Sequence, residues 1–290
     1  MTHLKKKYII LIAVLLAAIP FLFLKRQPEL YVLGMGGDLE SQLFSYVAQM
    51  GYANEFGKDV CLIKEHTVFD LPYRVCKKNE IDKAKQKKCK FKNFENVMED
   101  DSCSFLVGRV FEDKRFFEKG KKHILSDLVF KRFNNKRVRE MEKKITSTNS
   151  VAIHIRRGDY AKRGIPMIRL PYYRKATNYI QAHQKEPIHL FIFSDNIKWV
   201  KKAFKHFKLE YAITFVEGNS KEVDMYLMSL CHHDVIANSP YSWWAAYLNK
   251  NPNKIVIMPT VWGKNNIQRL YKDISPQNWK GIKPDVIISN

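Results

Sequence analysis

The second half of this 290-residue chain alternates short apolar runs with stretches of helical spacing, and this alternation restricts the fold more than any other feature. Strands are expected at Val151–Ile155, His189–Phe193, Ala212–Val216, Asp234–Ala237 and Ile255–Met258. Helices are expected between them, at Tyr172–His183, Ile197–Phe207, Glu222–Leu230 and Tyr241–Asn249. Short strands that alternate with helices of about three turns predict a doubly wound parallel sheet.

The first half is less regular. Leu30–Leu33 and Asp59–Ile63 have the composition of strands, and Gln42–Phe56 between them has helical spacing. Residues 74–102 are rich in lysine and have few periodic apolar positions, so we expect an extended surface excursion there. Helical spacing returns over residues 116–144.

The extreme N-terminus predicts a membrane anchor. Lys5-Lys6-Lys7 precede the uncharged 17-residue run Tyr8–Leu24, and Lys25-Arg26 follow it. This length is at the lower limit for a bilayer-spanning helix and exceeds the apolar core of most signal peptides. We therefore expect a cytosolic tail at 1–7 and a transmembrane signal anchor at 8–24. A cleaved signal peptide is the alternative.

The chain is strongly basic, with a formal net charge of +21. Residues 74–144 hold 22 basic and 12 acidic residues, which is about half of the excess. The basic residues are mixed with acidic ones and not with exposed aromatic residues, so nucleic acid is not the expected partner. A phosphorylated ligand or an anionic membrane surface fits this charge better than nucleic acid does, and a generally solvated basic face is the default interpretation ahead of any specific polyanion site.

Five cysteines bear on the compartment. Four of them lie in the N-terminal half, at Cys61, Cys76, Cys89 and Cys103. Two disulfides among these four are expected, with the pairing left open and Cys231 free in the core, which suits an oxidising compartment. The spacing matches no zinc motif, and the chain has no N-x-S/T sequon.

The segment His154–Tyr160, with the sequence H-I-R-R-G-D-Y, follows the first expected strand of the second half. Strand alternation places Val151, Ile153 and Ile155 on one face, and His154 and Arg156 on the other. Gly158 permits a turn, so Arg156 and Arg157 lie at the carboxyl edge of the sheet, where open α/β folds bind ligands. A guanidinium there suits a phosphorylated ligand, although an arginine pair at a strand end is more often a solvated loop edge.

Two further expected strands end in polar residues. Ser194-Asp195 follow one, and Asn238-Ser239 follow another. A helix cap is the default interpretation of each. A carboxylate at this edge can instead hold a ribose or base, and the helix after Ser239 offers free N–H groups to an anion.

Three segments together resemble the α-1,2-fucosyltransferases, glycosyltransferase family 11. They are H-I-R-R-G-D-Y at 154–160, F-I-F-S-D-N at 191–196, and D-M-Y-L-M-S-L-C-H-H-D-V-I-A-N-S-P-Y-S-W-W-A-A-Y-L-N at 224–249. The resemblance runs from about Gly108 to Asn249. It implies a GT-B-like fold of two Rossmann-type halves, with an N-terminal acceptor-side domain at 30–145 and a C-terminal GDP-fucose-binding domain at 150–290.

The resemblance also implies an activity. The family moves L-fucose from GDP-fucose to O-2 of a terminal galactose on a glycan, with inversion, and needs no metal or other cofactor. For this chain it implies a type II protein of the Golgi membrane with a lumenal catalytic part. The D-x-D sequence typical of metal-dependent glycosyltransferases is absent from the chain.

Roles for individual residues follow from the resemblance. Arg156 is expected to contact the donor diphosphate, and Asp159 completes the catalytic motif. The remaining donor-binding residues are expected to be His154, Arg157, Ser194, Asp195, Asn238, Ser239 and Ser242.

One segment departs from the family pattern. Ser41 stands where asparagine is expected, and Asp38 and Glu40 add negative charge to the glycine-rich loop that begins at Gly34. Asp38, Glu40 and Asp159 are all candidates for the base that the acceptor hydroxyl needs. Two alternatives remain open: a relative that binds donor or glycan without turnover, and a bacterial-type transferase that builds envelope polysaccharide on the cytosolic side.

Overall fold

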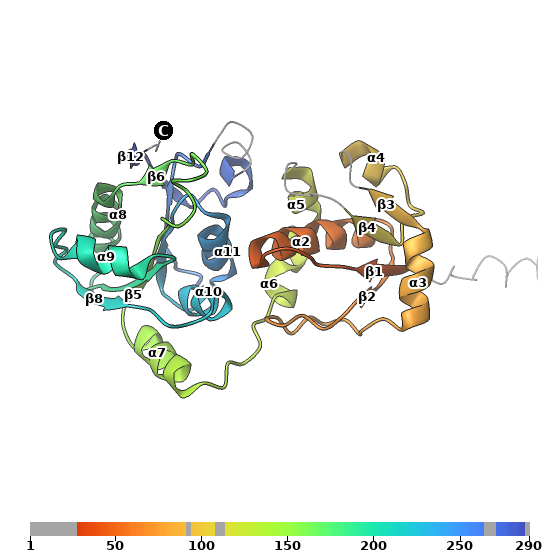
Figure 1. Cartoon of the computed structure of the whole chain (residues 1–290), viewed down its shortest axis with the longest axis horizontal. Helices are drawn as coiled ribbons and strands as arrows, with labels where there is room; N and C mark the ends of the chain where they lie inside the picture. Colours follow the sequence, from red (N-terminus) through yellow and green to blue (C-terminus); the bar gives the residue numbers. More distant parts are fainter. Residues whose placement is uncertain (1–27, 91–93, 108–113, 264–270, 288–290) are drawn as a thin grey trace, which may run out of the picture.

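The computed structural model describes residues 28–90, 94–107, 114–263 and 271–287 of the chain, and these form two α/β lobes (Figure 1). The expected anchor at 8–24 and cytosolic tail at 1–7 lie outside the described residues. Among the helices of the described residues, none has both the length and the apolar character that crossing a bilayer requires.

The C-terminal lobe contains a six-stranded parallel sheet with the order β11-β10-β9-β5-β7-β8. The strands are β5 (Ser150–Ile155), β7 (His189–Ser194), β8 (Ala212–Phe215), β9 (His233–Val235), β10 (Val256–Pro259) and β11 (Lys280–Ile282). The helices of this lobe are α7 (Lys136–Thr146), α8 (Leu170–Ala182), α9 (Ile197–Phe204), α10 (Lys221–Ser229) and α11 (Pro240–Leu248). The alternation expected from the sequence is confirmed, with boundaries that differ by a few residues.

Helices cover both faces of this sheet. Val151, Ile153 and Ile155 of β5 pack with α8 and α9, whereas Ala152 belongs to the core formed with α10 and α11. All six residues of β5 are buried, as expected of a parallel strand between two helical layers. A small antiparallel pair, β6 (Met167–Ile168) with β12 (Val286–Ile287), lies outside the main sheet.

The N-terminal lobe is built on one β–α–β unit. The strands β1 (Leu30–Leu33) and β2 (Asp59–Leu62) pair in parallel, and α2 (Leu39–Glu55) connects them. A second parallel pair joins β3 (Lys88–Lys90) to β4 (Phe105–Val107). The described residues of this lobe thus hold two short parallel sheets of two strands each, which are joined by a hydrogen bond from the Val32 N–H to the Ser104 carbonyl oxygen at 2.9 Å. Its other helices are α3 (Lys78–Gln86), α4 (Phe94–Met98), α5 (Lys114–Gly120), η1 (Lys121–His123) and α6 (Ile124–Asp127).

The segment 74–102 is not the extended excursion that its composition suggests. It contains α3, β3 and α4, and Ala84 and Val97 are buried. Disulfides Cys61–Cys76 and Cys89–Cys103 attach it to the rest of the lobe. The prediction of two disulfides with Cys231 free and buried is confirmed. The apolar pattern did not indicate this structure because the cross-links hold a segment that buries few side chains.

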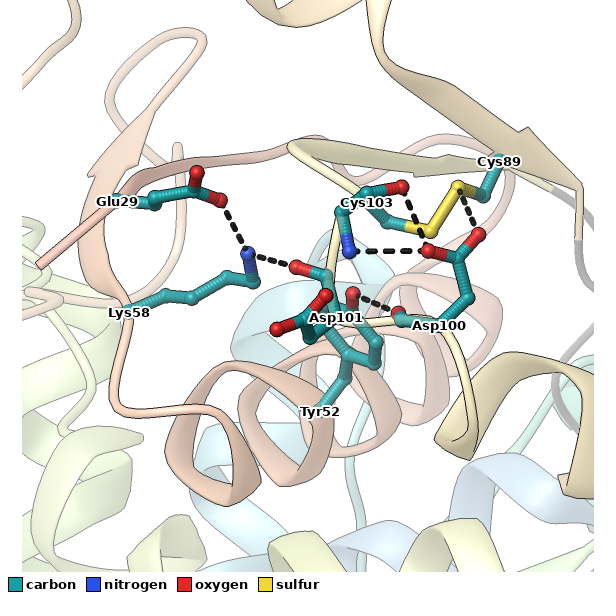
Figure 2. Close-up of a disulfide and its surroundings, with 8 residues drawn as sticks. Glu29, Tyr52, Lys58, Cys89, Asp100, Asp101 and Cys103 are labelled. Atoms are coloured by element: carbon teal, nitrogen blue, oxygen red, sulfur yellow. Dashed lines mark hydrogen bonds and ion pairs between the residues drawn. A yellow bond between two sulfur atoms is a disulfide. The ribbon is translucent and has the colours of Figure 1, made fainter.

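A network of polar contacts surrounds the second disulfide (Figure 2). The Tyr52 hydroxyl donates to the Asp100 carbonyl oxygen at 2.5 Å. Lys58 donates to the Glu29 carboxylate at 3.1 Å and also to the carbonyl oxygen of Asp101. The start of β1, the end of α2 and the disulfide loop are thus fixed to one another.

The two lobes share one hydrophobic core. The ring of Phe44, from α2, lies 4.9 Å from Trp244 and 5.8 Å from Trp243, both on α11 and both fully buried. Both tryptophans are therefore core residues. One turn further along α2, Gly120 permits the close approach of α5, because a Cβ at this position would meet the Val47 carbonyl oxygen at 1.8 Å.

Candidate active site

The site is built where β5 and β7 end side by side at the carboxyl edge of the main sheet. Ile155 of β5 is paired with Ser194 of β7. The Ser194 hydroxyl donates to the Ile155 carbonyl oxygen at 2.7 Å and accepts from the Asn196 N–H at 3.0 Å. Ser194 therefore holds the two strand ends together at the point where the arginine pair begins.

Arg156 is fixed by two carboxylates. Its Nη2 donates to Asp159 Oδ1 at 2.8 Å, and its Nε lies 3.1 Å from Asp195 Oδ2. The guanidinium also lies over the ring of Tyr160, 5.2 Å from the centroid. About a quarter of the side chain remains exposed. The result is a partly buried, oriented cation at the edge of the sheet, which is the arrangement an anionic ligand requires.

Asp195 positions the arginine loop. Its Oδ1 accepts the Arg157 N–H at 2.9 Å, and a Cβ on Gly158 would lie only 2.2 Å from its Oδ2. Any larger residue at position 158 would therefore displace the Asp195 carboxylate. The Arg157 guanidinium stacks on Trp199 of α9, at 3.8 Å. The structure thus brings Asp195 into contact with both arginines.

The helix that follows β7 is capped by neither Ser194 nor Asp195. Asn196 is the N-cap of α9, and its side-chain oxygen accepts the Trp199 N–H at 3.1 Å. The default interpretation of Ser194 and Asp195 as helix caps is therefore wrong, because both side chains are bonded to the end of β5 and the loop after it.

The polar residues after β9 lie beside this cluster. The Tyr160 hydroxyl donates to the Asn238 carbonyl oxygen at 2.8 Å, and the Asn238 amide donates to the Pro166 carbonyl oxygen at 2.8 Å. Ser239 is the N-cap of α11 but makes no capping bond with its side chain, and Ser242 donates to the Ser239 carbonyl oxygen at 3.3 Å. Asn238, Ser239 and Ser242 are all buried. They hold the N-terminus of α11 next to Tyr160, which itself supports Arg156.

His154 is buried on the side of β5 that faces α11. Its ring lies 5.3 Å from that of Tyr241, and within the described residues its Nδ1 has no hydrogen-bond partner. Burial, together with the charge of Arg156, lowers the pKa of His154 to about 3. The imidazole is therefore neutral at any working pH and does not serve as a proton donor.

The glycine-rich loop of the N-terminal lobe reaches the same site. Asp38 caps α2 by accepting the Ser41 N–H at 3.0 Å, and Gln42 donates to the Gly37 carbonyl oxygen at 2.8 Å. Burial raises the pKa of Glu40, in the first turn of α2, and the charges of Lys221 and Arg156 oppose that rise. Glu40 thus lies within electrostatic reach of Arg156 although it belongs to the other lobe.

The pKa of Asp159 shifts in the opposite direction to that of Glu40. Partial burial raises the pKa of Asp159, but hydrogen bonds from Arg163, at 3.0 Å, and from Arg156 outweigh burial, and the net pKa is lowered. Asp159 is therefore a weak base, and its main interaction is with the guanidinium groups.

Sequence reasoning assigned no role to Tyr160, Trp199 or Tyr241, which support Arg156, Arg157 and His154 respectively. Tyr160 and Tyr241 stand inside the motifs, and Trp199 follows one closely. Their positions inside or next to the family motifs were the available signal, but an aromatic residue in a motif is more often part of the core.

The family model for glycosyl transferase family 11 matches residues 71–283. The chain belongs to glycosyl transferase family 11. The Escherichia coli O-antigen biosynthesis glycosyltransferase WbnK is 38% identical to it over 133 residues, which are 44% of each chain. The Escherichia coli alpha-1,2-colitosyltransferase is 34% identical over 182 residues, 60% of this chain and 61% of that one. Rat galactoside alpha-(1,2)-fucosyltransferase 1 is 28% identical over 108 residues, 34% of this chain and 27% of that one. The matches thus span from about a quarter to three fifths of these relatives.

Solved structures agree with this assignment at the level of the fold. The fucosyltransferase NodZ from Bradyrhizobium superposes with a TM-score of 0.51 at 13% identity, over 75% of this chain and 91% of that one. NodZ alpha-1,6-fucosyltransferase soaked with GDP-fucose gives a TM-score of 0.50 at 14% identity, over 76% and 92%. The two α/β lobes of this family 11 chain therefore have the GT-B-like fold.

Proposed function

We propose that this protein is an inverting fucosyltransferase that moves L-fucose from GDP-fucose to O-2 of a terminal galactose on a glycan. One observation carries the proposal: Arg156 is oriented by Asp159 and Asp195 at the carboxyl edge of the sheet. The names of the related proteins support the α-1,2 linkage, since one transfers colitose and another fucose with this linkage.

In this proposal Arg156 and the N-terminus of α11 hold the donor diphosphate. As the bond from fucose to phosphate breaks, negative charge grows on the departing GDP, and a preset guanidinium with helix-end N–H groups stabilises it. Arg156 exchanges a carboxylate partner for phosphate oxygens when the donor binds. His154, Arg157 and Asp195 line the nucleotide side, with His154 neutral and therefore able to accept a hydrogen bond. Ser194, Asn238, Ser239 and Ser242 act by fixing the strand ends and the start of α11.

The base in this proposal is Glu40. The acceptor hydroxyl attacks the anomeric carbon and gives up its proton, so a carboxylate must face the donor site and have a pKa near the working pH. The pKa of Glu40 is raised by burial, and this side chain senses the charge of Arg156. Asp159 has a lowered pKa, and Asp38 is committed to the cap of α2.

The test uses the full chain with GDP-fucose and a β-galactoside acceptor, with and without EDTA. We expect fucose transfer that EDTA leaves unchanged, because Arg156 takes the place of a metal at the leaving group. Glu40→Gln should lower turnover about 10²- to 10⁴-fold with little change in donor binding. Asp38→Asn, which keeps a capping oxygen, is the matched control. Donor binding without any transfer would contradict the proposal and favour a binding-only relative.

A second donor is favoured by one specific observation. One relative, 34% identical over 182 residues, is an alpha-1,2-colitosyltransferase. Colitose differs from fucose by the absence of the 3-hydroxyl, so the same diphosphate contacts serve both donors. Competition between GDP-fucose and GDP-colitose at equal concentration decides which sugar the site accepts. Preference for colitose would change the proposed substrate but leave the proposed roles of Arg156 and Glu40 intact.

We also propose a location in the Golgi membrane with the catalytic part lumenal. The two disulfides support an oxidising compartment, and the apolar run Tyr8–Leu24 supports an anchor. Protease protection in intact vesicles tests this location. Digestion of the C-terminal part from the cytosolic side would contradict it and favour a transferase that acts on the cytosolic face.

A further inference from the structure

We propose that His66 is a positioning residue for the transfer reaction, because through Gln42 it holds the glycine-rich loop that leads to Glu40. His66 follows β2 in the N-terminal lobe and is only 6% exposed. The inference rests on the proposed function, in which Glu40 is the base. Sequence reasoning assigned no role to His66.

The glycine-rich loop is held at both ends by side chains of α2. Residues 34–37 are Gly-Met-Gly-Gly, and glycine permits many backbone conformations. At the first residue, the buried Gln49 side chain donates to the Gly34 carbonyl oxygen at 2.8 Å and accepts the Gly34 N–H at 3.3 Å. At the last residue, Gln42 donates to the Gly37 carbonyl oxygen at 2.8 Å. The course of the loop therefore depends on how these two amides are oriented.

His66 sets the orientation of the Gln42 amide. The N–H groups of Val68 and Phe69 both donate to Nδ1 of His66, each at 3.1 Å. An imidazole nitrogen that accepts a hydrogen bond carries no proton, so the proton of the neutral ring is on Nε2. Nε2 lies 2.9 Å from Oε1 of Gln42 and donates to it. The amide nitrogen of Gln42 is thereby directed at the loop.

The His66 ring stays neutral. Burial is the main cause that lowers its pKa to about 4, and the positive charges of Lys131 and Lys64 lower it further. A second proton would also remove the acceptor that two backbone N–H groups use. The direction of the hydrogen bonds from His66 to the loop is therefore constant at neutral pH.

The segment that contains His66 is attached to the linker between the lobes. Residues 128–135 form this linker, which joins α6 to α7 (Figure 1). Phe69 forms an antiparallel bridge with Phe130 of the linker, and their rings lie 4.6 Å apart. The Phe130 ring in turn lies 5.4 Å from that of Tyr226 on α10. His66 is therefore fixed relative to both lobes, and so is the loop that it holds.

The end of the loop determines where Glu40 lies. The Gly37 carbonyl belongs to the peptide that precedes Asp38, the N-cap of α2, and Glu40 is in the first turn of this helix. A base must lie within hydrogen-bond reach of the hydroxyl that it deprotonates. A displacement of about 1 Å can cost roughly 10²-fold in rate. Loss of the His66 hydrogen bond should therefore lower turnover, whereas donor binding, assigned above to Arg156 and α11, should not change.

Two substitutions of His66 separate its two sets of hydrogen bonds. The side-chain oxygen of asparagine takes the place of Nδ1, so His66→Asn keeps an acceptor for the two backbone N–H groups but loses the donor to Gln42. The side-chain nitrogen of glutamine reaches the place of Nε2, so His66→Gln keeps the donor and loses the backbone bonds. His189→Asn is the matched control, because it removes a contact of Nε2 with Thr214, at 2.8 Å, in the other lobe.

The experiment uses the full chain with GDP-fucose and a β-galactoside, and hydrogen exchange is followed in the peptide that covers residues 34–41. We expect His66→Asn to lower turnover roughly 10- to 100-fold, with unchanged GDP-fucose binding and unfolding midpoint. Exchange in residues 34–41 should become faster. His66→Gln should lower the unfolding midpoint but keep more turnover than His66→Asn, and His189→Asn should change neither turnover nor exchange in the loop.

Nitrogen-15 NMR of labelled histidine gives a readout that does not require activity. At neutral pH the signals that disappear in His66→Asn should come from a ring with the proton on Nε2. A proton on Nδ1 would overturn the proposal. Wild-type turnover in His66→Asn would also overturn it, as would a loss of turnover without faster exchange in the loop. Parallel losses of turnover and stability in both His66 variants would indicate a purely structural histidine.

Failure of the proposed function has a different signature. A wild-type chain that transfers no fucose, or a Glu40→Gln variant as active as wild type, would count against the reaction and against the base. Exchange in residues 34–41 of His66→Asn would still decide whether His66 holds the loop. A damaging Glu40→Gln together with an unaffected His66→Asn would leave the proposed function standing and overturn the role of His66.

Discussion

The two lobes of this protein are stabilised in different ways. The C-terminal lobe has a six-stranded sheet with helices on both faces, and its one cysteine, Cys231, is free. The N-terminal lobe has two short two-stranded sheets and two disulfides among its described residues. Small sheets bury too little apolar surface to be stable alone, so cross-links compensate where the sheet is small. The difference indicates that the C-terminal lobe is a stable scaffold for the site, and that the N-terminal lobe depends on cross-links and on its contact with α11.

The largest loss of stability is expected from a substitution at the contact between the two lobes. Phe44→Ala removes a ring that packs on Trp243 and Trp244, and should lower the free energy of unfolding by about 3–5 kcal/mol. Because this ring joins the lobes, calorimetry should resolve two transitions in place of one. Phe94→Ala, whose ring contacts Phe116 within the N-terminal lobe, should cost less and leave a single transition. Identical behaviour of the two variants would show that the shared core does not couple the lobes.

The second largest effect is expected on turnover, from a substitution in the C-terminal lobe. Arg156→Lys keeps the charge but loses the fork that binds two partners, so turnover should fall roughly 10²- to 10³-fold, about 2.7–4 kcal/mol. Stability should change little, since the side chain is partly exposed. Arg157→Lys, whose guanidinium stacks on Trp199, should cost less. Equal losses in both variants would contradict the separate roles assigned to the two arginines.

Removal of a disulfide should affect one lobe. Cys89→Ala/Cys103→Ala opens a loop with a sequence separation of 14 and should cost about 3 kcal/mol of unfolding free energy. Hydrogen exchange should rise in α2 and α3 but not in β5 or β7. Cys231→Ala, in the other lobe, is the control and should have a smaller effect without a change in α3. Faster exchange throughout the C-terminal sheet would mean that the disulfide supports both lobes.

The smallest effect depends on pH and belongs to the C-terminal lobe. Burial raises the pKa of Asp234 to about 7, although Lys254 and a hydrogen bond from Asn249 oppose this rise. Between the unfolded pKa and 7 the folded state binds the extra proton, so the contribution of Asp234 to stability decreases as pH rises. From pH 5 to pH 8 the loss should be roughly 2–3 kcal/mol. Asp234→Asn should remove this decrease in urea titrations, and an unchanged pH profile would contradict the assignment.

Much of the C-terminal lobe could be predicted because its strands and turns are indicated by short, local sequence patterns. The apolar run before His154 is long enough to identify a strand, and Gly158 marks the turn that exposes Arg156. The likeness of 154–160, 191–196 and 224–249 to family 11 was confirmed by the family match. The sequence did not predict which side chains at the ends of the strands contact one another. Asp195 contacts Arg156 and Arg157 across 38 or more residues, and such pairing depends on the register of β5 and β7.

The N-terminal lobe was predicted less well for a physical reason. Periodicity reports burial, and α3 buries only Ala84, so a helix held by Cys61–Cys76 has no apolar stripe to reveal it. The number of disulfides followed from the count of cysteines, but their pairing did not, because four cysteines permit three arrangements. Glu40 was visible as a departure from the family pattern. Its proximity to Arg156 arises only when α2 docks on the other lobe.

The order of the cysteines along the chain has a consequence for biosynthesis. Each disulfide joins near neighbours, with separations of 15 and 14 residues, and the second closes at Cys103. During synthesis from the N-terminus, all four partners emerge well before Cys231. The only thiol that could compete for them appears after they have had time to pair, and it is then buried in the hydrophobic core between α10 and β9. We therefore expect oxidation in the compartment of synthesis to yield few mispaired chains, even if folding of the C-terminal lobe is slow.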